Sequence, residues 1–245
     1  MDKRLAFKFI LTIGFLAGIS SALSGQERYT DGLYWLGFKV KTEFGDKWSA
    51  SLEFEERRFM FPDRAHQRTL PDVSVFYHFS PEWKTGLSYT NFSIRSPGTA
   101  DLPISSILSE QRYSLFLAKS FKLSQKDGMY TQWKTELRNF DRDPNDGELN
   151  YLDYLIRLRF LFRYSYTLEN NWKLNCGDEL HLHTAGNSDH QLFDQNRIFA
   201  GISKSISDWN CALGYIFWYQ KNRKGSAIFS RHILRFTCTY TLSFR

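Results

Sequence analysis

Charged side chains recur at every second position in several segments, and these residues are the best placed to do chemistry. Glu53, Glu55 and Arg57 form one such run, and Arg157 and Arg159 form another. Successive residues of a β-strand point to opposite faces, so each run shares one face. Inside a barrel such a face would carry a network of ion pairs, or it would line a narrow pore or pocket. A pore or pocket surrounded by arginine and lysine residues prefers anions. The predicted lumen-lining residues are Glu53, Glu55, Arg57, Glu136, Arg138, Arg157, Arg159, Glu179, His181, His183 and Arg235.

His181 and His183 have a spacing that can hold a metal, because they lie two residues apart, with Glu179 two residues earlier. Alternate strand positions converge on one side, and neutral imidazole is a common metal ligand. No third ligand is identifiable beyond candidates such as His78 or His190. We therefore predict a polar lining here, with no metal and no cofactor.

An outer-membrane enzyme that processes lipids is the main catalytic alternative. Such enzymes use a Ser–His pair with a carboxylate or amide partner, and these groups come from distant strands. The chain has no G-x-S-x-G motif and no spacing that singles out a nucleophile, so no catalytic residue is assigned. Its basic residues are interleaved along strands rather than clustered, a pattern that does not predict binding to nucleic acid.

The segments that carry these residues alternate with period two, which is typical of strands with one apolar and one polar face. In 154–168 the even positions are aromatic or aliphatic, whereas the odd ones include Arg157, Arg159 and Arg163. Single-chain bacterial barrels have even strand numbers, so we predict about 12 strands, with ten as the alternative. The segments recognised are eleven: 33–44, 48–59, 70–80, 83–94, 111–123, 129–140, 151–168, 172–184, 197–206, 209–220 and 231–244.

Four short turns are followed at once by a tryptophan: Trp48, Trp83, Trp172 and Trp209. Longer polar loops lie between these turns. Short turns at one end, long loops at the other and aromatic girdles at the interfaces are the plan of an outer-membrane barrel. The sequence therefore predicts an all-β fold, a single antiparallel up-and-down transmembrane β-barrel, with these four residues in an aromatic girdle.

Alternation does not itself decide which face is outward, and a soluble periplasmic lipocalin-like barrel that binds an apolar ligand stays as an alternative. Strand length favours lipid, because a tilted transmembrane strand needs about 9 to 11 residues. Lys119 and Lys204 then fall on the lipid face near short turns, where they can snorkel to the interface. Asp178 falls there too, and Gly177 beside it suggests a local bulge.

The 245 residues carry a net charge of +6 and have a mean hydropathy of -0.44, which does not fit a helical membrane protein. Residues 1–24 have a basic start, an apolar run over 9–19 and a small-x-small site ending at Ser24, the layout of a secretory signal peptide. We predict a signal peptide over 1–24 and one barrel domain over 25–245. The odd number of cysteines, Cys176, Cys211 and Cys238, leaves at least one free thiol.

Three stretches, 48–59, 193–202 and 239–244, resemble an uncharacterised outer-membrane β-barrel family that is catalogued as a domain of unknown function. The resemblance covers roughly 33–245. It implies an outer-membrane barrel and carries no catalytic residues. The aromatic C-terminal strand that ends near Phe244 is also similar to the signal read by the barrel-assembly machinery.

The sequence as a whole predicts an integral outer-membrane protein of the Gram-negative envelope that reaches the membrane after export directed by its signal peptide. We expect a non-enzymatic, porin-like barrel acting as a narrow pore, a binding protein or an envelope component. Its expected partners are outer-membrane lipid and the barrel-assembly machinery, with no nucleic acid. The oligomeric state is not assigned.

Overall fold

The computed structural model describes residues 27–60, 66–95, 107–141, 153–186, 191–221 and 227–244, and this part of the chain is all-β. The predicted signal peptide over 1–24 lies outside the described residues. No helix in the described part is long and apolar enough to cross a membrane. The strands are β1 (Glu27–Phe44), β2 (Trp48–Phe59), β3 (His66–His78), β4 (Trp83–Arg95), β5 (Ile107–Lys122), β6 (Asp127–Asp141), β7 (Asp153–Thr167), β8 (Trp172–Gly186), β9 (Phe193–Ile206), β10 (Trp209–Lys221) and β11 (Ala227–Phe244).

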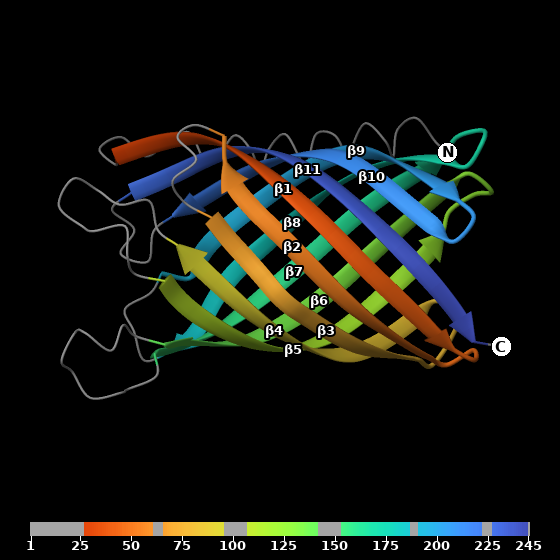
Figure 1. The fold of residues 1–245 in the computed structure, drawn as a ribbon, viewed down its shortest axis with the longest axis horizontal. Helices are drawn as coiled ribbons and strands as arrows, with labels where there is room; N and C mark the ends of the chain where they lie inside the picture. The colour runs from red at the N-terminus through yellow and green to blue at the C-terminus, as the bar shows by residue number, and fades with distance from the viewer. Residues whose placement is uncertain are drawn as a thin grey trace.

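The strands form one closed barrel in which each strand pairs with its neighbours in the sequence, and β1 pairs with β11 (Figure 1). Ten of the pairings are antiparallel, and the β1–β11 pairing is parallel, in register from Glu27↔Ala227 to Phe44↔Phe244. The predicted barrel is confirmed, and each of the eleven predicted segments corresponds to a strand. The described residues form eleven strands rather than the predicted twelve or ten. A barrel with an odd number of strands closes through one parallel pair, which here is β1 with β11.

Five short connections gather at one end of the barrel, on the right of Figure 1, and we call this end the short-turn rim. They comprise residues 45–47, 79–82, 123–126, 168–171 and 207–208. Tight turns of this kind need left-handed backbone, which glycine and asparagine adopt most readily. Gly45 has φ +61° and Asn170 and Asn171 have φ 55° and 61°.

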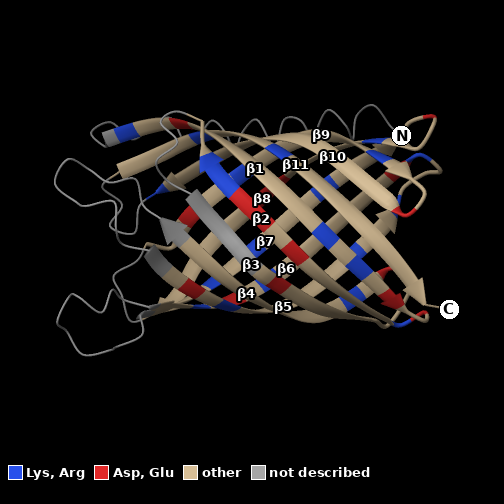
Figure 2. Cartoon of the chain, viewed as in Figure 1, with Lys and Arg blue, Asp and Glu red and all other residues tan. Residues whose placement is uncertain are grey.

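The two faces of the wall differ in chemistry. Large apolar side chains point outward and are exposed: Leu87 is 65%, Leu115 55% and Trp133 50% accessible. Charged side chains point inward, and Glu110 and Glu136 are 0% accessible. Figure 2 shows that acidic and basic positions lie near one another on neighbouring strands. The alternation of the sequence therefore separates an apolar exterior from a charged interior.

The bulge suggested at Gly177 is wrong, because β7 and β8 stay in register from Arg163↔Gly177 to Phe162↔Asp178. The pairing of β8 with β9 shifts instead between His181 and Leu182. Gly177 is needed for another reason. A Cβ there would lie 2.2 Å from the Phe162 carbonyl oxygen and 2.5 Å from Phe199 Cζ.

Two of the three cysteines form a disulfide bond, Cys211–Cys238, between directly opposed residues of β10 and β11. Cys176 on β8 is free and exposed. Sequence spacing did not indicate this pairing, because the two cysteines are 27 residues apart and are brought together only by the ladder between the strands.

Candidate functional site

The predicted lumen-lining residues lie in three sets of ion pairs on the inner wall. The first set centres on Glu136 of β6. Arg157 Nη2 lies 2.5 Å from Glu136 Oε2, and Arg159 Nη1 lies 2.7 Å from Oε1. Lys134 Nζ is 3.0 Å from the same Oε1. A buried carboxylate is tolerated when it is paired and hydrogen-bonded. The three cations around Glu136 therefore stabilise its ionised carboxylate inside the barrel.

Two further acidic residues extend this set along β8 and β9. Arg157 Nη1 lies 3.0 Å from Asp194 Oδ2, and Arg159 Nη2 lies 2.5 Å from Glu179 Oε1. Each arginine therefore bridges Glu136 to a carboxylate on another part of the wall. These ion pairs connect four consecutive strands, β6, β7, β8 and β9, along one part of the inner wall.

The second set is centred on Glu110 of β5, which is fully buried. Arg112 Nε and Nη2 donate to its two oxygens at 2.6 and 2.8 Å. Arg138 Nε and Nη2 donate to the same oxygens at 2.5 and 3.1 Å. Bidentate pairs of this type fix geometry as well as charge.

The third set joins β1, β2 and β11. Arg235 Nη2 lies 2.7 Å from Glu55 Oε2 and 3.4 Å from Glu53 Oε1. Arg57 Nη2 is 2.6 Å from Glu55 Oε1, and Lys39 Nζ is 3.0 Å from Glu53 Oε2. This set therefore ties the parallel seam to the first hairpin from the inside.

His181 and His183 are buried among these carboxylates. The Gln195 amide donates to His181 Nδ1 at 2.7 Å, and His181 Nε2 lies 3.0 Å from Glu179 Oε2. His183 Nε2 lies 3.5 Å from Asp194 Oδ2. Both ring nitrogens of His181 thus have protein partners. Within the described ranges, no group of three or more His, Cys, Asp or Glu side chains is arranged to hold a metal ion.

The charged residues of the interior include several that were not predicted from the sequence, among them Lys84, Glu110 and Asp194. Glu110 lies one position before the predicted fifth strand, and Asp194 lies in a predicted loop, so the boundaries excluded them. Lys84 was recognisable, because it alternates with the outward residues Leu87 and Tyr89 along β4.

One wall of the interior is apolar, which the sequence did not predict. Leu33, Trp35, Ile216, Trp218 and Ile233 form a buried cluster on β1, β10 and β11. Arginine side chains cover its aromatic rings, with Arg57 Cζ 4.0 Å from the Trp35 ring centre. The apolar cluster is therefore packed directly against the ion-paired part of the interior.

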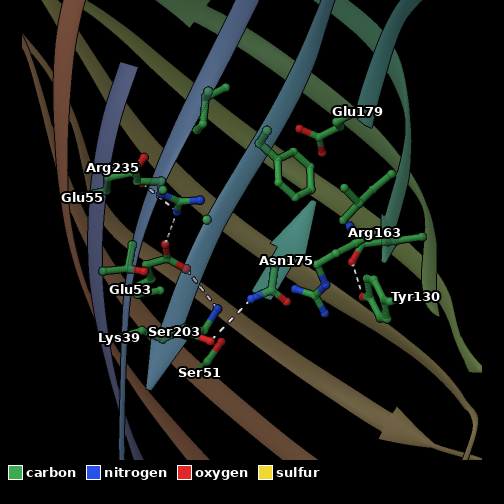
Figure 3. Close-up of a pocket in the computed structure, with 18 of the residues that line it drawn as sticks. Lys39, Ser51, Glu53, Glu55, Tyr130, Arg163, Asn175, Glu179, Ser203 and Arg235 are labelled. Atoms are coloured by element: carbon green, nitrogen blue, oxygen red, sulfur yellow. Dashed lines mark hydrogen bonds and ion pairs between the residues drawn. The ribbon is translucent and has the colours of Figure 1, made fainter. Parts of the chain in front are cut away.

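A cavity of about 760 Å³ occupies the half of the interior nearer the short-turn rim. The ion pairs of Glu55, Arg159 and Glu179 contribute to its inner boundary, and hydroxyl and amide side chains such as Ser51 and Ser203 line its sides. In Figure 3, Arg163 reaches into the cavity next to Tyr130, on the wall that faces Glu53 and Lys39. The half of the interior nearer the short-turn rim is therefore open, and the other half is filled by ion pairs.

A serine and a histidine meet at the edge of this cavity. Ser49 Oγ lies 3.0 Å from His78 Nε2. A catalytic histidine is normally oriented by a third group. Among the described residues, no carboxylate is hydrogen-bonded to His78, so this pair lacks that group.

The four predicted girdle residues lie at the short-turn rim, where each begins its strand or follows directly on the turn. Trp48, Trp172 and Trp209 are exposed, and Trp83 is half-buried. Lys119 Nζ lies 4.9 Å from the Trp83 ring centre, and Lys204 Nζ lies 4.8 Å from that of Trp172. Asp178 accepts a hydrogen bond of 2.7 Å from the Asn196 amide on the neighbouring strand.

The fold and the site together define a class: single-chain closed β-barrels with an apolar exterior and an ion-paired interior. The chain belongs to the family described as "Protein of unknown function (DUF2490)", which matches residues 32–228. Nine chains of solved structure match as well. One of them, described as "NanC porin structure in rhombohedral crystal form", is 12% identical, with a TM-score of 0.49, over 78% of this chain and 85% of that chain. No curated protein matches.

Proposed function

We propose that the protein is an integral, non-enzymatic outer-membrane β-barrel whose interior cavity acts as a binding pocket or a strongly constricted pore. The outward apolar residues would face lipid. The ion pairs would restrict passage through the lumen, and the cavity would open toward the periplasm, because short turns are periplasmic in such barrels.

The observation that carries the proposal is the sidedness of the wall. Exposed Leu87, Leu115 and Trp133 would meet water in a soluble protein, and large exposed apolar surfaces are rare on soluble monomers. The fully buried Glu110 and Glu136 also make the interior unsuited to an apolar ligand. Both observations support a barrel whose outer face contacts lipid and whose interior holds water or a polar ligand.

A substitution on the outer face separates the membrane barrel from the soluble alternative. Leu115→Arg places a charge on the apolar belt, where a midplane arginine costs about 2 to 4 kcal/mol in lipid. We expect this variant to lose folded protein in the membrane fraction. Leu123→Arg, at a short turn, is the matched control and should fold normally. Equal folding of both variants in lipid would contradict the proposal.

The location itself is tested by fractionation. The outer-membrane fraction is run on a gel with and without boiling, and a parallel sample is washed with sodium carbonate. We expect a heat-dependent change in migration and retention after the wash. Quantitative release, or recovery as a detergent-free monomer, would favour a soluble periplasmic barrel. Incubation of purified protein with envelope lipids should yield no product, and product formation would favour the enzyme alternative.

The route to the membrane is part of the same proposal. The signal peptide over 1–24 would direct export, and the strand that ends near Phe244 would be recognised by the barrel-assembly machinery. Deletion of 2–24 should leave the protein in the cytoplasm. Phe244→Ala should let the chain reach the periplasm but reduce its assembly, which the heat-dependent gel shift measures. Normal assembly of either variant would remove that step from the proposal.

A further inference from the structure

The cavity contains cations that the chain does not neutralise. Lys84, Arg163 and Lys173 line it and have no carboxylate partner within 4.0 Å among the described residues. Other lining cations are paired, as Lys39 is with Glu53 and Arg235 is with Glu55. The unpaired groups therefore stand out against the other cations of the lining, each of which lies within 4.0 Å of a carboxylate.

Two of these cations are held around one tyrosine. Lys84 Nζ lies 5.6 Å from the ring centre of Tyr130 and 4.7 Å from that of Phe76. Arg163 Cζ lies 4.8 Å from the Tyr130 ring centre. A ring face attracts a cation but does not cancel its charge. The two groups are thus positioned by aromatic contacts, and no carboxylate among the described residues balances their charge.

Small side chains on β5 allow Lys84 to reach Tyr130. Lys84 on β4 pairs with Ala118 on β5, and Tyr130 on β6 pairs with Arg163 on β7. Tyr130 also pairs with Ser120 on β5. Because Ala118 and Ser120 are both small, the Lys84 side chain can pass over β5 to reach Tyr130. Figure 3 shows Tyr130 and Arg163 side by side at the cavity wall.

From these observations we propose that Lys84 and Arg163 bind the oxyanion group, a carboxylate or a phosphate, of a small hydroxylated molecule that enters from the short-turn rim. This inference rests on the proposed function, since it names the ligand class of the same cavity. The missing counter-charge of the two cations is supplied by the ligand.

The remaining walls fit the rest of such a molecule. Ser51 Oγ is buried, lines the cavity and has no hydrogen-bond partner among the described residues. Asn175, Ser203 and Asn210 add further donors and acceptors to the lining. A cavity of about 760 Å³ is within the usual range for small-molecule sites. Hydroxyl groups of a ligand would satisfy these polar atoms, whereas an apolar ligand would not.

The test uses the full-length folded protein in detergent at low ionic strength, with calorimetric titration of inorganic phosphate, of gluconate and of uncharged glucose. We expect a Kd below about 1 mM for phosphate or gluconate and no detectable binding of glucose. Phosphate alone would identify a phosphorylated ligand, gluconate alone a hydroxylated carboxylate, and both would show that the oxyanion dominates recognition. Each of these three results supports the proposal.

The variant Lys84→Gln with Arg163→Gln should weaken binding by about tenfold or more, because it removes both charges. The matched control, Lys119→Gln with Lys204→Gln, removes two lysines near the same rim on the outer face and should bind as the wild type does. Heat-dependent migration verifies that each variant is folded.

The proposal is overturned if folded wild-type protein binds neither anion, if it binds glucose equally well, or if the Lys84/Arg163 variant binds like the control. Failure of the membrane proposal is recognised separately. Release by carbonate would refute the location while leaving the titration of the cavity unaffected.

Discussion

The interior charges act as groups, and Glu136 has the largest number of partners. Its two carboxylate oxygens form ion pairs with Arg157, Arg159 and Lys134, and its side chain is fully buried. Removing one member of a buried set leaves the other charges uncompensated in a low-dielectric interior, which costs more than the intact set gains. The stability of the barrel therefore depends on individual carboxylates.

We predict that Glu136→Gln lowers the free energy of unfolding by about 3 kcal/mol, since three buried cations then lose their shared counter-charge. The measurement is a urea titration of the detergent-folded protein, followed by tryptophan fluorescence. Glu82→Gln, at an exposed turn, is the control and should change little. Equal stability of the two variants would mean that water, rather than Glu136, compensates these cations.

Gly177 provides a prediction about packing. Gly177→Ala should destabilise the barrel by about 1 to 3 kcal/mol, because the new methyl group would overlap the Phe162 carbonyl oxygen and the Phe199 ring. Gly214→Ala is the matched control, as its nearest neighbour would be the Ala200 carbonyl oxygen at 3.3 Å. The same urea titration compares them. A smaller effect at Gly177 than at Gly214 would show that both the β7 backbone and the Phe199 ring shift to admit the methyl group.

At this scale the sequence predicts the face of a strand but not the partners on it. Period two assigns Glu136, Arg157 and Arg159 to one face. That Arg157 also binds Asp194 depends on two successive strand registers, β7–β8 and β8–β9, including the shift between His181 and Leu182. The contact of Lys84 with Tyr130 crosses β5 at Ala118 and Ser120, two small residues. Such details follow from pairing in space, which alternation does not encode.

At the scale of the strand, alternation was sufficient to find all eleven segments, because each has one face in contact with the interior. The number of strands could not be settled in the same way. It depends on whether β1 pairs with β11, and in which direction, and no local pattern in Glu27–Phe44 reports that. The expectation of an even count assumed antiparallel closure throughout.

The disulfide between β10 and β11 predicts a definite number of thiols. Unfolded protein should react with one equivalent of thiol reagent before reduction and with three after it, because only Cys176 is free. The measurement is a thiol count in denaturant. Cys176→Ala is the control and should give none before reduction and two after it. Three reactive thiols in unreduced protein would contradict the Cys211–Cys238 bond.

At the scale of the whole molecule, the interior is divided between ion pairs and a cavity. Open aqueous porins have about 16 to 18 strands, so a barrel closed by the eleven described strands, with charged side chains inside, should conduct weakly in a planar bilayer. We predict that Glu55→Ser with Arg57→Ser increases the conductance. This double substitution removes two large side chains from the lumen, and Arg235 keeps Glu53 as a partner.

The control for the conductance measurement is Glu56→Ser with Arg58→Ser. These residues form the ion pair on the opposite face of the same strand, with Arg58 Nε 2.9 Å from Glu56 Oε1. The control should leave the conductance unchanged. An equal rise in both variants, or none in either, would show that the Glu55–Arg57 pair does not obstruct the lumen.

The parallel pairing of β1 with β11 has a consequence for experiments on living cells. β1 runs toward the short-turn rim and so does β11, since Phe44 and Phe244 are paired there. In a barrel that spans the outer membrane as proposed, epitopes inserted next to Glu27 and next to Phe244 would therefore emerge in different compartments. In an even-stranded barrel both would report the same side. A circular permutant would likewise need a linker as long as the barrel wall, whereas a hairpin closure needs only a few residues.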